Sequence, residues 1–135
     1  MQFIHFTTAD GHNELYINPE TVGNLIGDEY EADGGHTIFT IIETTYGTSY
    51  RVKGDPEDVA DLLGADFQTR HVFGDHLISS RLYWWLFKNE IMDVKQLEDV
   101  CQNEHDAKLR YSMPHQVVVE IHSVFPIKVA GREYE

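Results

Sequence analysis

The chain has 135 residues, of which 41% are hydrophobic and 12% aromatic, and its formal net charge at pH 7 is −13. That length is sufficient for one ordinary domain or two minimal ones with a buried core. No apolar run reaches the roughly 18 residues of a membrane-spanning helix, and the N-terminus lacks the basic and apolar regions of a signal peptide. The single cysteine, Cys101, cannot form an internal disulfide. We therefore expect a cytoplasmic protein of a prokaryotic cell or its phage.

The negative charge is concentrated in the first half of the chain. Residues 1–66 carry 13 Asp/Glu against 2 Lys/Arg, a balance of −11, whereas residues 67–135 carry 10 against 8, a balance of −2. Phosphate backbones are bound mainly by Lys and Arg, so only the second half is suited to approach nucleic acid. The acidic half either keeps the protein soluble or binds a basic protein surface, and both interpretations stay open.

The first half contains the same pattern twice. Each copy has a hairpin with a glycine turn, followed by a helix that begins with an N-cap and a proline and ends at a glycine. We therefore predict a ββα-ββα order and an α+β domain with one antiparallel sheet. The predicted strands are residues 3–8, 15–17, 37–45 and 49–52, with turns at Asp10-Gly11 and Tyr46-Gly47, and the predicted helices are residues 18–27 and 55–64.

These signals also carry a resemblance. The Asn18-Pro19-Glu20 helix start, the glycine-turn hairpin that leads to Tyr50-x-Val52, and the second x-P-E-x-V helix start look like the small FlbD-like proteins linked to bacterial flagella. The resemblance covers nearly the whole first half. It implies the same α+β fold and no catalysis.

The second half is predicted to be helical. Residues 65–75 lack periodicity, so we place the domains at 1–66 and 67–135. In a first helix, Leu82, Trp85 and Leu86 lie on one side, and Arg81, Trp84 and Lys88 lie on another. A second helix begins at the N-cap Asp93, with Gln96 completing a capping box and an apolar stripe of Val94, Leu97, Val100 and Cys101 behind it. Residues 116–125 contain three consecutive valines, which favour a strand, but Pro114 before them is typical of the first turn of a helix, so both alternatives stay open.

This segment resembles the C-terminal domain of the bacterial RNA polymerase α subunit, a small all-α bundle with a helix-hairpin-helix that grips DNA. The resemblance is carried by S-x-R-x-x-x-x-L from Ser79 to Leu86, by Ile91, Val94 and Leu97, and by Glu120-Ile121. It implies that residues 116–125 are helical, with Val118, Ile121 and Phe125 in the core. It also implies a minor-groove role for Arg81. Trp84 stands where the family has an asparagine, and the family's hairpin glycine and Lys-Ser fall on Pro114, Gln116 and Val117.

No pattern of catalytic residues is present. Eight histidines and Cys101 with His105 lack the paired spacing of a zinc site, and we expect no metal and no cofactor. Neither a phosphate-binding glycine loop nor a nucleophile elbow occurs. The carboxylates Asp55, Glu57 and Asp58 follow a helix N-terminus, where they stabilise the helix. We expect a protein without enzymatic activity.

The aromatic cluster around Trp84 is the main candidate for binding. We expect Trp85 to lie in the core, because a small bundle needs large apolar side chains. Trp84 lies on the side of Arg81 and Lys88, and tryptophan and arginine are enriched in binding hot spots. We expect that its ring is covered by a partner, by a second copy of the chain or by the first domain, or that it stacks on an unpaired base.

Three functions are consistent with these observations. The first is an adaptor or regulator, with transcription as a setting, that binds a protein partner through the polymerase-like domain. The second is a nucleic-acid-binding accessory protein. The third is an acidic inhibitor that mimics DNA. We favour the first, and the sequence leaves the oligomeric state open. The predicted binding residues are Arg81, Trp84, Lys88, Lys108, Arg110 and Gln116.

Overall fold

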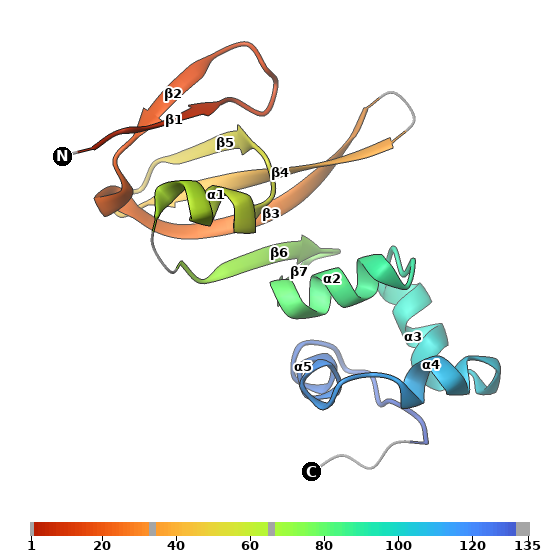
Figure 1. The fold of residues 1–135 in the computed structure, drawn as a ribbon. Helices are drawn as coiled ribbons and strands as arrows, with labels where there is room; N and C mark the ends of the chain where they lie inside the picture. The colour runs from red at the N-terminus through yellow and green to blue at the C-terminus, as the bar shows by residue number, and fades with distance from the viewer. Residues whose placement is uncertain (1, 33–34, 65–66, 132–135) are drawn as a thin grey trace. The chain divides into compact units, whose positions relative to one another are not determined.

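The computed structural model describes residues 2–32, 35–64 and 67–131, and it contains both helices and sheets, so the fold is α+β. The chain divides into two compact units, Met1–Val72 and Phe73–Glu135, whereas the sequence placed the division between residues 66 and 67. Figure 1 shows the elements of both units in colour from the N-terminus to the C-terminus.

The first unit contains a small hairpin, a larger sheet and one α-helix. Within this unit the strand order of the larger sheet is β5-β4-β3-β6. Strands β1 and β2 form a separate two-stranded sheet. The elements in chain order are β1 (Ile4–Thr7), β2 (Glu14–Ile17), the 3-10 turn η1 (Pro19–Thr21), β3 (Val22–Ala32), β4 (Gly35–Thr44), β5 (Ser49–Lys53), α1 (Pro56–Leu63) and β6 (Thr69–Phe73).

Both predicted hairpins are confirmed. Strands β1 and β2 pair antiparallel across the turn at Asp10-Gly11, and β4 and β5 pair antiparallel across Tyr46-Gly47. Gly11 and Gly47 have φ angles of 81° and 86°, a left-handed conformation that a residue with a side chain rarely adopts. The turn glycines therefore fix where each pair of strands reverses.

The predicted helix over residues 18–27 is wrong. Asn18 does act as an N-cap, because its side chain accepts a hydrogen bond from the Glu20 N–H at 3.1 Å. The helix ends after one 3-10 turn, and Val22 begins the long strand β3, which pairs with β4. Two glycines and two β-branched residues between positions 22 and 27 lower the helix propensity, and β4 supplies the backbone hydrogen bonds instead. The duplicated ββα-ββα order is therefore not what the chain forms.

The predicted helix over residues 55–64 is confirmed as α1. Its N-cap Asp55 accepts a hydrogen bond from the Asp58 N–H at 2.9 Å, and Gly64 ends it with a φ of 77°. Helix α1 contacts β3 and β4 and covers one face of the sheet (Figure 1). The core beneath it contains Phe6, Ile17, Val22, Leu25, Ile42, Val52, Val59, Ala60 and Leu63.

Residues 65–75 were predicted to be the boundary between the domains, but Thr69–Phe73 form strand β6. Thr69, Arg70 and His71 pair in parallel with Leu25, Ile26 and Gly27 of β3. This pairing joins segments more than 40 positions apart, so no local pattern could indicate it.

The second unit opens with β7 (His76–Ser79) and continues as a set of helices. These are α2 (Ser80–Lys88), α3 (Val94–Gln102), the 3-10 turn η2 (Glu104–Asp106), α4 (Ala107–Tyr111) and α5 (His115–Val124). The largest fully buried apolar side chains of this unit are Ile78, Leu82, Leu86, Leu97, Ile121 and Phe125.

Two helix predictions in this unit are confirmed. Asp93 accepts a hydrogen bond from the Gln96 N–H at 2.8 Å, and the Gln96 side chain accepts one from the Met92 N–H at 2.6 Å, so α3 begins with a reciprocal cap. Residues 115–124 form α5 despite their valines, with Val118 and Ile121 buried. Tertiary packing outweighs the strand preference of β-branched residues here.

Candidate functional site

Helix α2 begins at a cap that two elements share. The Ser79 hydroxyl accepts a hydrogen bond from the Leu82 N–H at 3.1 Å and is itself bonded to the Glu120 carboxylate of α5. The same carboxylate accepts from the Ser79 N–H at 2.7 Å. These bonds place the first turn of α2 against α5 and determine which side of α2 is buried.

The buried side of α2 consists of Leu82, Tyr83 and Leu86. Trp85 was predicted to lie in this core, and that prediction is wrong, because Trp85 is half-buried whereas Tyr83 is only 5% exposed. The capped start of the helix rotates positions 82, 83 and 86 inward. Around the helix axis, Trp85 lies about 100° from the centre of the buried side, and its side chain is therefore at the margin of that side.

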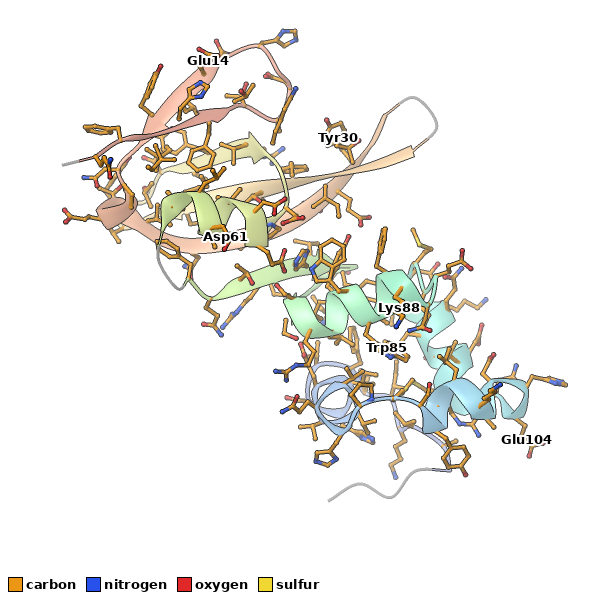
Figure 2. All side chains as sticks on the ribbon, in the orientation of Figure 1. Glu14, Tyr30, Asp61, Trp85, Lys88 and Glu104 are labelled. Carbon is orange, nitrogen blue, oxygen red and sulfur yellow. The ribbon has the colours of Figure 1, made fainter. Side chains whose placement is uncertain are left out.

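The opposite side of α2 carries two tryptophans and two cations. Arg81, Trp84, Trp85 and Lys88 are spaced i, i+3, i+4 and i+7, the spacing that gathers side chains on one side of a helix. We call these four residues the tryptophan face. Arg81 and Lys88 are exposed and both indoles are half-buried. Figure 2 shows Trp85 and Lys88 projecting from α2.

The Trp84 ring is held by its aromatic neighbours. Its centroid lies 5.0 Å from that of Tyr83 and 5.5 Å from that of Phe87, both in edge-to-face geometry. Such pairs are favoured by the quadrupoles of the rings. Because Tyr83 is buried, it anchors the indole, and less conformational entropy is lost when a partner contacts this ring.

Two other predicted binding residues are exposed on different helices. Lys108 lies on α4, and Gln116 lies in the first turn of α5. Lys108 was predicted as one of the basic residues of the nucleic-acid-binding alternative, and Gln116 was predicted from its position in the polymerase resemblance. Trp85 was missed as a surface residue, although its position four residues after Arg81 was a signal that could have found it.

Arg110 was predicted to bind a partner, and the structure assigns it a different role. It is 5% exposed, and its guanidinium donates to the carbonyl oxygen of Ala130 at 2.8 Å and to that of Asn103. A buried guanidinium with these bonds ties the C-terminal segment to the turn after α3. Arg110 is therefore buried and not part of an exposed binding surface.

The described residues contain no group of three His, Cys, Asp or Glu side chains that could hold a metal ion. Cys101 is buried, and burial raises the pKa of its thiol to about 11, so the reactive thiolate is scarce at neutral pH. In the first unit, the Nε2 atom of His71 lies 3.2 Å from Oε1 of Glu57, but the His71 side chain is only 1% exposed. A histidine so enclosed contributes to packing and has no surface through which to meet a substrate.

His71 makes the stability of the first unit depend on pH. Burial lowers the pKa of His71, although Glu57, Asp55 and Glu29 raise it. The unfolded chain therefore binds a proton at this histidine more readily than the folded chain does. We expect the free energy of unfolding to fall as the pH drops below about 6.5, the ordinary pKa of histidine. The slope is at most about 1.4 kcal/mol per pH unit. Urea unfolding between about pH 5.5 and 7.5, followed by circular dichroism, measures this slope.

The His71→Gln variant should lose this slope, and His5→Gln, at a side chain that is 46% exposed, should keep it. A slope unchanged in His71→Gln would contradict the assignment. The range stops at about pH 5.5 because burial raises the pKa of Asp55, which acts in the opposite direction at lower pH.

Comparison of the chain with protein-family models, with curated proteins and with solved structures found no match. In the described ranges, no helix is both long enough and apolar enough to cross a membrane. The geometry of the tryptophan face is therefore the basis on which a function can be assigned.

Proposed function

We propose that the protein is a non-enzymatic adaptor or regulator, and that its second unit binds an acidic surface of a protein partner through the tryptophan face. The observation that carries the proposal is the gathering of Arg81, Trp84, Trp85 and Lys88 on the side of α2 opposite to Leu82, Tyr83 and Leu86. A few residues contribute most of the binding energy in protein interfaces, and tryptophan and arginine are enriched among them.

The chemistry of this face favours an acidic protein over nucleic acid. Two exposed cations beside two indoles can pair with carboxylates while the rings contact apolar side chains. Nucleic acid needs a larger basic surface, and the chain has a net charge of −13 with Arg110 committed to internal hydrogen bonds. The resemblance of residues 79–121 to the polymerase α C-terminal domain supports a role in transcription.

Replacing Arg81 and Trp84 together by alanine should weaken partner binding at least tenfold, since truncation of such residues costs about 2 kcal/mol or more. The partner is first recovered from the native host by affinity purification, and its affinity is then measured with the purified proteins. Trp84 and Trp85 are the only tryptophans, so intrinsic fluorescence reports directly on this face during the titration.

The matched control is the double variant Met92→Ala/Lys95→Ala, which removes another exposed apolar side chain and another exposed cation from the same unit. It should bind like the wild type. Equal affinity of the Arg81→Ala/Trp84→Ala variant would overturn the site. A steep loss of binding to duplex DNA between low and high salt would instead indicate the nucleic-acid function.

A further inference from the structure

A hollow of about 490 Å³ lies on the first unit, beside the place where the chain after β1 meets β5. The N–H of Ala9 donates to the Arg51 carbonyl oxygen at 2.9 Å, and both residues line the hollow. Strands β3 and β4 contribute Tyr30 and Phe39 to its wall. Sites for small molecules have volumes of roughly 300–1,000 Å³, so the hollow is large enough for one.

The wall of the hollow is aromatic. The rings of Tyr30 and Phe39 lie 5.7 Å apart between centroids, and the Arg51 guanidinium carbon lies 5.7 Å above the centre of the Phe39 ring. Phe39 is 5% exposed, whereas Tyr30, labelled on β3 in Figure 2, is 37% exposed. Tyr30 therefore offers a ring surface to an incoming planar group, and Phe39 supports the two side chains around it.

Arg51 is a conspicuous cation in an acidic unit. Only three Lys/Arg occur in residues 1–72, against 13 Asp/Glu. Among the described residues, the Arg51 guanidinium lies over the Phe39 ring and forms no ion pair with a carboxylate. A guanidinium presents several donors in one plane, a geometry that suits a carboxylate. Its placement at the hollow supplies an anchor for an anionic group.

Asp10, also at the hollow, limits the charge of the ligand. Its Oδ1 atom accepts hydrogen bonds from the Thr8 hydroxyl at 2.6 Å and from the His12 N–H at 2.9 Å. Thr8 above all lowers the pKa of Asp10, so the group is ionised at neutral pH. A fixed negative charge in the same hollow as Arg51 disfavours a doubly charged phosphate more than a singly charged carboxylate.

We propose that this hollow binds a small aromatic monocarboxylate, with its ring against Tyr30 and its carboxylate on Arg51. The ring contact uses the exposed ring of Tyr30, and the ion pair neutralises the Arg51 guanidinium. This site lies within the first unit and is independent of the tryptophan face.

The probe is 4-hydroxybenzoate, titrated into the full-length chain while ¹H–¹⁵N amide shifts are recorded. We expect saturable shifts at Ala9, Tyr30 and Arg51, with a Kd of roughly 1 mM or tighter, a range that a ligand of this size can reach. The neutral analogue 4-hydroxybenzyl alcohol should bind at least tenfold more weakly, and so should AMP.

Arg51→Gln should weaken binding of 4-hydroxybenzoate at least tenfold. The control is Lys53→Gln, which removes the neighbouring cation on the same side of β5, outside the hollow, and should leave the Kd unchanged. Amide shifts that match those of the wild type away from the substituted residue verify that each variant is folded. Absence of saturable shifts, an equal loss in both variants, or tighter binding of AMP would each overturn the proposal.

Discussion

The Gly27→Ala variant should be less stable than the wild type by about 3 kcal/mol. A Cβ atom at Gly27 of β3 would lie 2.5 Å from the Nδ1 atom of His71 and 2.8 Å from Cγ of Pro56. Neither neighbour moves readily, because the imidazole is enclosed and the proline ring is buried in the first turn of α1. Inserting a methyl group into so tight a contact costs about 1–3 kcal/mol or more.

Urea unfolding followed by far-ultraviolet circular dichroism measures this loss, and hydrogen exchange of the β3 and β4 amides assigns it to the first unit. The control is Gly23→Ala on the same strand, where the nearest atom to an added Cβ is the Glu43 carbonyl oxygen at 3.4 Å. That variant should change stability by less than about 1 kcal/mol. Similar effects at both glycines would show that the crowding around His71 is not the cause.

The Arg110→Ala variant should destabilise the second unit, also by about 3 kcal/mol. It deprives the Asn103 and Ala130 carbonyl oxygens of a charged donor and leaves a cavity in a buried region. The Ala130 N–H also donates to the Cys101 carbonyl oxygen at 2.8 Å, so both backbone groups of Ala130 tie the C-terminal segment to the rest of this unit. Denaturant unfolding followed by tryptophan fluorescence reports on this unit, because both tryptophans belong to it.

Loosening of the C-terminal segment gives a second readout. Lys128 is exposed within it, and Ile127 and Val129 beside it are buried. Trypsin should cut after Lys128 faster in Arg110→Ala than in the wild type, because proteolysis requires local opening. The control Lys108→Ala, at an exposed cation on the same helix, should match the wild type in stability and in cleavage after Lys128. If Arg110→Ala behaved like that control, the tether would not be significant.

The binding surface could be predicted only in part. Spacing placed Arg81, Trp84 and Lys88 together, because residues on one helix have fixed angular relations. Spacing could not decide whether Tyr83 or Trp85 is buried, since both border the apolar stripe. Glu120, 41 positions from Ser79, holds the start of α2 and thereby decides it. The hollow around Arg51 was not predicted, because it joins the turn after β1 with residues of β2, β3, β4 and β5.

The sequence by itself determined the features that depend on neighbouring residues. These are the glycine turns of the two hairpins and the capped helices α1 and α3, where a side chain meets the backbone two or three positions away. Tertiary structure decided where the chain had two options. Residues 22–32 pair with β4 instead of continuing a helix, and Thr69–Phe73 adds to the sheet.

The valine-rich α5 and the buried Arg110 follow the same rule. Helix α5 buries Val117, Val118 and Ile121, and Arg110 finds its carbonyl partners on segments that only the fold brings near. Backbone hydrogen bonds and apolar burial outweigh the propensities of single residues, which differ by about 1 kcal/mol or less. Local chemistry therefore decides turns and caps, and remote partners decide which segments become strands and which charges are buried.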